Sequence, residues 1–353
     1  MSDEASDEAS DEVEGIEVEP VTEWIAARTR ITPPLSFRTI EGGRSNLTYD
    51  VRDADGRRLI LRRPPLNSVL ESAHDMGREH RIISALAGSG VPVPPTVGYE
   101  PETEVNGAPF YVMEFVEGVV LRNAQDAEQH LEPATRDAAA DSLIDVLVRL
   151  HQLDPDEIGL GDLGRKEEYL ARQLRRWKSQ LEKGRVRDVP VLDEVHRRLE
   201  ADIPEQDGVS VVHGDYKLEN VILDPATGAV RAVLDWELTT LGDPLADLGL
   251  LLVYWGEPGD TVGIPGSASA AEGFPGRDEV VRRYAERSGR DVSEIDYYYA
   301  FGTWKLACII EGVYARMAAG AYGDQAQENA EGFGDMVIAL GDVSLEATAK
   351  AGR

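Results

Sequence analysis

Three oxygen-bearing side chains flank two short apolar runs in the second half of the chain. Asp215 and Asn220 precede the run at residues 221–223, and Asp235 follows the run at residues 230–234. A Pro-Ala-Thr-Gly turn joins the runs, which predicts a hairpin with its polar residues at one end. Two carboxylates and an amide oxygen near one point suit Mg²⁺, which leaves room for phosphate and water.

The regions around this hairpin have the apolar spacing of helices. Helices are expected at residues 134–153, 166–183, 191–201, 245–255, 277–288, 294–319 and 325–349. Asp243 and Pro244 are typical of a helix cap followed by the first helical position. A Gly-, Pro- and Ser-rich stretch at residues 256–276 is long for a connection, which favours a lid or a surface insertion.

The first third of the chain has short, β-type apolar runs instead. Antiparallel strands are expected at residues 47–52 and 57–63, joined by an Asp-Ala-Asp-Gly turn. The other expected elements are helices at residues 21–29 and 76–87, an extended connection at 91–99 and a strand at 110–116. This order predicts an α+β protein in which a small antiparallel β-sheet lobe with one helix precedes a larger, mainly helical lobe.

Charge excludes some partners. The 353 residues include 65 Asp and Glu against 36 Lys and Arg, a net charge of -29, which argues against nucleic acid or an anionic membrane as a partner. Residues 1–20 contain nine of the acidic side chains and no basic one, and are expected to form a disordered tail. Without them the balance is 56 acidic to 36 basic, or -20. Adaptation to high salt explains this excess, and an ordinary acidic protein with a solubilising tail is the alternative.

Cys308 is the only cysteine, so neither an intramolecular disulfide nor a Cys-x-x-Cys metal site is expected. The first residues lack the basic start and apolar core of a signal peptide, and no run has the length of a membrane span. These features predict a soluble, cytoplasmic protein. They do not identify a protein partner.

The segment His213-Gly-Asp215-Tyr-Lys-Leu-Glu-Asn220 resembles the kinase catalytic loop, with Gly in place of the Arg of H-R-D. This form is usual in small-molecule kinases of the aminoglycoside phosphotransferase and choline kinase group. The resemblance spans roughly residues 39–322 and implies a protein-kinase-like two-lobe fold. Residues 21–117 would form the nucleotide-binding lobe, and residues 118–353 the helical lobe with the catalytic loop and substrate site.

The same resemblance gives roles to the polar residues of the hairpin. It implies that Asp215 orients the acceptor hydroxyl and accepts its proton, while Asn220 and Asp235 bind Mg²⁺ beside the phosphates of ATP. Glu237 replaces the Gly of D-F-G and is a further candidate for the metal. His213 is assigned a structural role. Asp243 and Asp247 match the family's G-D-P-x-x-D-L stretch and are interpreted as scaffold.

In the first lobe, residues 41–46 occupy the place of the phosphate-covering loop. Gly42, Gly43, Ser45 and Asn46 are the candidate phosphate contacts, because glycines let backbone N–H groups approach an anion. The stretch is not a full G-x-G-x-x-G. A plain glycine turn between strands is the competing interpretation.

The strand that usually carries the phosphate-binding lysine ends in arginine. Alternation places Arg62 at the position of the Lys in V-A-I-K, with Glu79 as its partner on the following helix and Arg63 as the second choice. Glu114 and Phe115 would form the hinge against the adenine ring, or belong to a plain core strand.

The substrate side is expected on the helix at residues 294–319. Lys305, Gly312 and Arg316 fall on one face beside Glu311, where the two cations could hold an anionic substrate or be ordinary solvated charges. This helix and the stretches LRRPP and GGRSNLTY resemble the kinase-like domains fused to acyl-CoA dehydrogenases. That likeness gives a hydroxyacyl or other acidic acceptor more weight than an aminoglycoside.

These features predict an ATP- and Mg²⁺-dependent phosphotransferase that acts on a hydroxyl of a small molecule. The alternative is a nucleotide-binding pseudokinase or regulatory scaffold, because Arg62 stands where lysine is usual. A protein kinase is disfavoured, because Asp243 follows Asp235 too closely for a D-F-G to A-P-E activation segment.

Overall fold

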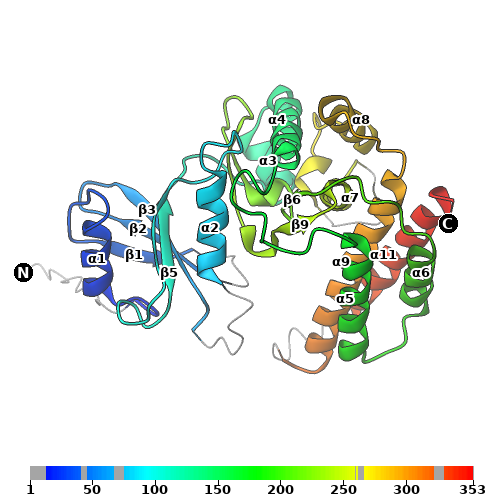
Figure 1. The fold of residues 1–353 in the computed structure, drawn as a ribbon, viewed down its shortest axis with the longest axis horizontal. Coiled ribbons are helices and arrows are strands. Elements are labelled where there is room, and N and C mark those ends of the chain that lie inside the picture. The colour runs from blue at the N-terminus through cyan, green and yellow to red at the C-terminus, as the bar shows by residue number, and fades with distance from the viewer. Residues whose placement is uncertain are drawn as a thin grey trace, which may run out of the picture. The chain divides into compact units, whose positions relative to one another are not determined.

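A computed structural model of the chain describes residues 13–40, 46–66, 75–258, 260, 266–321 and 330–352. The chain divides into two compact units (Figure 1). The first unit comprises Met1–Gly88 and Pro92–Glu117, and the second comprises Ser89–Val91 and Gly118–Arg353. Among the helices described, none combines the length and apolar character that a bilayer span requires.

The first unit is a five-stranded antiparallel sheet in the order β1-β2-β3-β5-β4, with helices α1 and α2. Its elements are β1 (Ser36–Thr39), β2 (Leu47–Arg52), β3 (Arg58–Arg63), β4 (Thr96–Glu100), β5 (Phe110–Glu114), α1 (Val18–Ala26) and α2 (Met76–Leu86). The predicted strand pair is confirmed, because Leu47 pairs with Arg63 and Arg52 with Arg58. Period-two alternation buries Leu59 and Leu61 of β3 in the apolar core shared with α1, which leaves Arg62 on the other face.

Two expectations for this unit need correction. The connection at 91–99 is partly a strand, since β4 pairs with β5. Residues 13–20, assigned to the acidic tail, belong to the folded unit. Ile16 is buried in the core, and the hydroxyl of Tyr49 donates to the carbonyl of Glu14.

The second unit is mainly helical, with two small antiparallel sheets, β6 with β9 and β7 with β8. Its helices are α3 (Ala124–His130), α4 (Pro133–Gln152), α5 (Tyr169–Gly184), α6 (Pro190–Ala201), α7 (Pro244–Tyr254), α8 (Arg277–Ser288), α9 (Ile295–Ala318) and α11 (Ala330–Lys350). The strands are β6 (Ser210–Val212), β7 (Val221–Leu223), β8 (Val230–Val233) and β9 (Thr240–Gly242), with short 3-10 turns η1 (Leu218–Asn220), η2 (Trp236–Leu238) and η3 (Ala268–Ala270). The predicted helices are confirmed to within a few residues where the chain is described.

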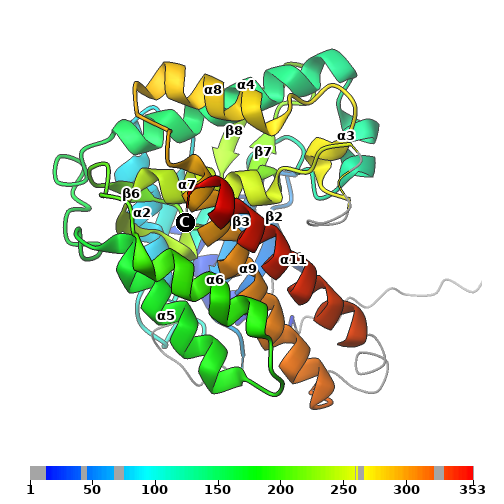
Figure 2. The ribbon, with the colours of Figure 1, turned by 90° about the vertical axis from the view of Figure 1, so that its right-hand side faces the viewer.

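Packing in this unit follows the apolar faces. Almost every residue of α7 is buried, which its nearly continuous apolar sequence predicts. Close contact between α7 and α9 needs a glycine, because a Cβ on Gly249 would lie 2.6 Å from the backbone of Tyr298. Figure 2 shows α5, α6, α9 and α11 side by side, with α8 beside α4. The helices thus enclose the two small sheets that carry the polar loop.

Candidate active site

The two strands β7 and β8 bring the polar residues of the hairpin together, as the sequence predicts. The N–H of Leu234 donates to the carbonyl of Asn220 over 2.8 Å, which places the residue before β7 beside the residues after β8. Asp235 follows directly. Its backbone is left-handed, with φ 64° and ψ 61°, a conformation that Asp tolerates better than most residues and that is frequent at functional sites.

Asp215 lies in the loop between β6 and η1, and its carboxylate has three polar contacts. The side-chain amide of Asn220 donates to Asp215 Oδ2 over 2.9 Å and to its main-chain carbonyl over 2.8 Å. Lys217 Nζ lies 3.0 Å from the same Oδ2, and the side chain of Asp215 is 20% exposed. The hydroxyl of Tyr254 also hydrogen-bonds Asp215; burial, followed by Asp215, raises the pKa of this phenol. The carboxylate is therefore oriented but still open to solvent.

The backbone before Asp215 is anchored from α7. Asp247 is buried, and its two carboxylate oxygens accept from the N–H of His213 at 2.6 Å and the N–H of Gly214 at 2.8 Å. Burial alone would raise the pKa of Asp247, but the hydrogen bonds from His151 and Gly214 lower it overall. Asp247 thus serves as scaffold, as predicted.

Gly214 is held on its other sides as well. Its φ is +84°, and a Cβ there would lie 2.9 Å from the carbonyl oxygen of Leu238. Lys305 of α9 donates to its carbonyl over 3.1 Å. A side chain at this position is excluded both by backbone conformation and by space. This explains locally why Gly stands where H-R-D has Arg.

Asn220, Asp235 and Glu237 are the residues that could hold a divalent metal ion. Asn220 uses its amide nitrogen on Asp215, so its oxygen is left as a possible ligand. Asp235 and Glu237 are both partly buried. Within the described residues no group of three or more His, Cys, Asp or Glu side chains is arranged for a metal. Two carboxylates and one amide nevertheless fit Mg²⁺, which completes its shell with phosphate and water.

In the first unit, Glu79 of α2 is the centre of a buried polar cluster. It accepts from Asn46 at 2.8 Å and from the hydroxyl of Tyr111 at 2.9 Å, and Arg62 of β3 lies 3.3 Å away. Burial raises the pKa of Tyr111; Arg62 opposes this shift and Glu79 adds to it. The predicted partnership of Arg62 and Glu79 is thus present. Gly42, Gly43 and Ser45 lie outside the described residues.

Glu114 and Phe115, the predicted hinge, already use their backbone donors. The N–H of Glu114 donates to the carbonyl of Pro95 and the N–H of Phe115 to the carbonyl of Arg58. The Arg58 guanidinium also covers the ring of Phe115 at 3.4 Å. Any contact with adenine would therefore use their carbonyls or side chains, and the hinge stays a prediction.

The three predicted substrate residues of α9 do not form one cluster. Lys305 is buried beside the catalytic loop, and Arg316 is exposed nearer the end of the helix. Glu311 is buried and held by Arg187, whose Nη2 lies 2.7 Å from its Oε2. That ion pair gives Glu311 a structural partner, and the substrate role stays a prediction.

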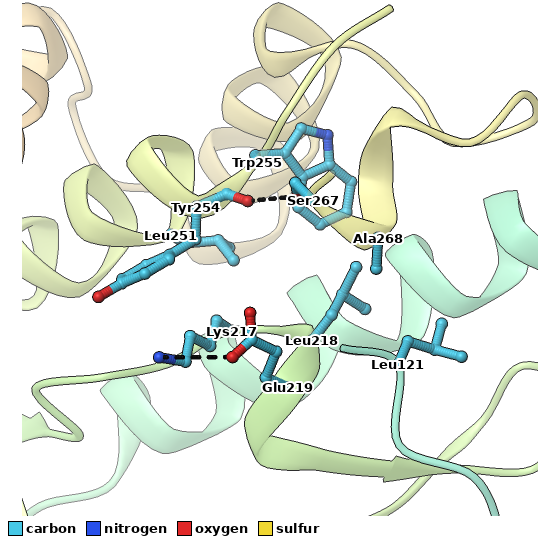
Figure 3. A pocket seen from close by; sticks show the side chains of 9 residues that line it. All are labelled: Leu121, Lys217, Leu218, Glu219, Leu251, Tyr254, Trp255, Ser267 and Ala268. Atoms are coloured by element: carbon cyan, nitrogen blue, oxygen red, sulfur yellow. Dashed lines mark hydrogen bonds and ion pairs between the residues drawn. The ribbon is translucent and has the colours of Figure 1, made fainter. Parts of the chain in front are cut away.

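Lys217 and Tyr254 were not predicted as site residues. Lys217 Nζ lies 4.3 Å from the centre of the Tyr254 ring, and both contact Asp215. They also line a small hollow between the catalytic loop and α7 (Figure 3). The hollow is otherwise lined by Leu121, Leu218, Glu219, Leu251, Trp255, Ser267 and Ala268. The position of Lys217 two residues after Asp215 was a usable signal in the sequence, whereas Tyr254 had none.

Residues 36–291 match the phosphotransferase enzyme family. The chain belongs to that family. A solved structure from Ralstonia eutropha JMP134, described as a candidate aminoglycoside phosphotransferase, superposes with a TM-score of 0.81 at 32% identity and covers 95% of this chain and 99% of its own. A macrolide 2'-phosphotransferase from Brachybacterium faecium shares the fold, with a TM-score of 0.57 at 21% identity over 90% of this chain and 97% of its own. The kinase-like fold and the resemblance to this family are thereby confirmed.

Curated relatives of this family member are longer proteins. Acyl-CoA dehydrogenase family member 10 of Mus musculus is 32% identical over 336 residues, which cover 92% of this chain and 30% of the relative. Acyl-CoA dehydrogenase family member 11 of Gallus gallus is 33% identical over 320 residues, which cover 88% of this chain and 40% of the relative. The chain thus spans less than half the length of these relatives. The predicted likeness to proteins of this group is confirmed.

Proposed function

We propose that this family member transfers the γ-phosphate of ATP to a hydroxyl of a small molecule. The observation that carries the proposal is the arrangement around Asp215, whose carboxylate is held by Asn220, Lys217 and Tyr254 and remains partly exposed. A phosphotransferase needs such a carboxylate to align the acceptor hydroxyl and to take its proton. Positioning then supplies most of the rate enhancement.

Lys217 has two uses in this proposal. Its ammonium group lies 3.0 Å from Asp215, which helps to fix the orientation of the carboxylate. The same cation can neutralise charge on the transferred phosphoryl group. The ring of Tyr254 limits the positions open to the lysine, since the ammonium lies over its face.

Asn220 and Asp235 would hold Mg²⁺, with Glu237 as a further candidate. Bound there, the metal would neutralise charge on the β- and γ-phosphates. The protein fixes the two ligands by the Leu234 to Asn220 hydrogen bond and by the left-handed backbone of Asp235. In the first unit, Arg62, held by Glu79, is proposed to bind the nucleotide phosphates, with Asn46 supporting Glu79.

Substitution of Asp215 tests the proposal. Purified protein is incubated with ATP, Mg²⁺ and a panel of hydroxylated metabolites, and phosphorylated products are detected by mass. The wild type is expected to phosphorylate at least one member, whereas Asp215→Asn should lower kcat by orders of magnitude and leave nucleotide affinity nearly unchanged. Nucleotide binding by the wild type without transfer to any member would favour the pseudokinase alternative.

A further inference from the structure

A strongly basic segment crosses this acidic protein. Residues 165–187, which include α5, contain nine basic and three acidic side chains, a balance of +6 against -29 for the whole chain. Carboxylates neutralise several of these cations, as in the pairs of Lys178 and Arg185 with Asp193. Other cations of this segment, Arg172 and Arg176, have no carboxylate partner among the described residues.

A further cation, Lys305, lies outside this segment and is buried beside the catalytic loop. Its side chain belongs to α9, which packs against α5 (Figure 2), and the residue is only 9% exposed. Its ammonium group makes one hydrogen bond, to the carbonyl of Gly214, and lies 5.7 Å from the ring centre of Trp177. Among the described residues no carboxylate lies within ion-pair distance. A buried ammonium has three donors, so this arrangement is costly without an anion.

Two arginines of α5 extend this cationic region. Arg172 and Arg176 follow Tyr169 by three and seven residues, which places the three on one face of the helix. Tyr169 packs on Gly242 of β9, so this face lies toward the sheet of β6 and β9, and β6 leads into the catalytic loop. Arg172 Nη1 is buried without a hydrogen-bond partner in the described part of the chain. Arg176 is exposed and has no carboxylate partner among those residues.

The electrostatics agree with the geometry. Burial lowers the pKa of Lys305; Asp215 and Asp247 oppose this shift, while Arg176 and Lys217 add to it. Lys217 and Lys305 are held at adjacent residues, Lys217 at Asp215 Oδ2 over 3.0 Å and Lys305 at the Gly214 carbonyl over 3.1 Å. A ligand anion would offset their mutual repulsion.

We infer that the acceptor carries an anionic group, a carboxylate or a phosphate, which binds between α5 and α9 at Lys305, with Arg176 at the rim and Arg172 beside it. The inference rests on the proposed function, because the acceptor hydroxyl must lie at Asp215. Gly214 joins the two places, since its carbonyl binds Lys305 and Asp215 follows it in the chain. Arg316 has no part in this site.

The test uses matched acceptors. Three acceptors share one hydroxylated carbon chain and differ only in its end group, which is a carboxylate, a phosphate monoester or a neutral amide. Comparison of the first two shows which anion the site prefers. Steady-state kcat and KM are measured with ATP and Mg²⁺, and binding of the same compounds is measured by saturation-transfer NMR with ADP present. The wild type should bind and phosphorylate one of the anionic members at a KM well below that of the amide.

The variants are Lys305→Met, Lys305→Arg and Arg176→Gln, with Arg175→Gln as the control. Arg175 is the neighbouring exposed arginine and pairs with Glu168 at 3.8 Å. Lys305→Met should raise KM for the anionic acceptor roughly ten- to hundredfold more than KM for the amide, as expected for loss of a charged hydrogen bond, whereas any fall in kcat through the Gly214 contact should be equal for the two acceptors. Lys305→Arg should recover part of the loss. Arg176→Gln should raise KM a few-fold, and Arg175→Gln should not.

Three results would overturn the inference. The first is equal binding and turnover of anionic and neutral acceptors by the wild type. The second is an equal change in KM for anionic and neutral acceptors in Lys305→Met, because the lysine would then serve only the Gly214 carbonyl. The third, decisive if Lys305→Met does not fold, is identical behaviour of Arg176→Gln and Arg175→Gln. Absence of any transfer contradicts the proposed function instead, and the NMR arm then still decides whether anions bind.

Discussion

Asn220 Nδ2 donates to Asp215 Oδ2 over 2.9 Å, so a proposed metal ligand also orients the proposed proton acceptor. Asn220→Asp would replace this donor by a second carboxylate, which cannot donate to Asp215 and repels it. We expect kcat to fall on the order of a hundredfold. Asn123→Asp is the control, because Asn123 caps α3 and Asp caps equally well. An unchanged kcat in Asn220→Asp would show that Asn220 does not orient the proton acceptor.

Asp247→Asn should weaken the hydrogen bonds that hold the backbone of the catalytic loop. The carboxylate accepts from the N–H groups of His213 and Gly214, and an amide would turn a donor toward one of them. We expect a loss of about 2–4 kcal/mol in the free energy of unfolding, measured by urea titration. Asp75→Asn is the control, because exposed Asp75 caps α2 through the N–H of Arg78 and Asn is an equally good cap. Equal losses in the two variants would contradict the anchoring role.

His151 predicts a specific pH dependence of stability. It is buried between Tyr284 at 2.8 Å and Asp247 at 3.4 Å, and burial lowers its pKa more than Asp247 raises it. The unfolded state therefore binds a proton at higher pH than the folded state. Stability should fall as pH drops below about 6.5, by up to ~1.4 kcal/mol per pH unit, until the folded pKa is reached. Between pH 8 and 5, the urea midpoint of His151→Gln should change less than that of the wild type. If the midpoints of the two proteins change in parallel with pH, His151 is not the source of the pH dependence.

The acidic surface predicts that salt stabilises the fold. At about 2 M KCl the self-repulsion of a net charge of -29 is largely screened. Local pairs act in the opposite direction; Arg287 of α8 contacts Asp141 and Asp145 of α4, and salt weakens such exposed contacts. We expect the urea midpoint to rise between 0.1 and 2 M KCl, while the cost of Arg287→Gln becomes smaller. Equal midpoints at the two concentrations would rule out adaptation to high salt.

Nucleotide affinity tests Arg62. Arg62→Lys keeps the charge near Glu79 and should weaken ADP binding by less than about tenfold, whereas Arg62→Met should weaken it roughly ten- to hundredfold. Fluorescence titration measures both. Arg63→Lys is the control, since the Arg63 side chain bonds the carbonyls of Gly15 and Asn106. If only the Arg63 variant weakens ADP binding, Arg63 and not Arg62 is the residue that binds the nucleotide phosphates.

Local patterns were sufficient for much of the fold. The predicted bounds of α8 hold at both ends because Gly276 precedes it and Gly289, at φ 69°, ends it. The hairpin of β7 and β8 and the cap at Asp243 follow from turn and capping residues in the same way. Short elements such as α3 and β6 were missed, because a few residues contain too little periodicity.

The site was less predictable, because its contacts join distant segments. Apolar spacing shows that α7 is buried, but it does not show that Tyr254 at its end meets Asp215. Spacing on α9 grouped Glu311 with Lys305, yet the partner of Glu311 is Arg187, beyond the end of α5. Helical periodicity gives the face of a residue and leaves its neighbours on other elements undetermined.

The close packing around Gly214 has a consequence for protein engineering. Its N–H is bound by α7 through Asp247, its carbonyl by α9 through Lys305, and the space of a Cβ is filled by Leu238. The conformation of residues 213–220 therefore depends on contacts with other elements of the chain. A transplant of this loop into another scaffold would need to bring parts of α7, α9 and η2 with it, and a loop moved alone would lose the orientation of Asp215.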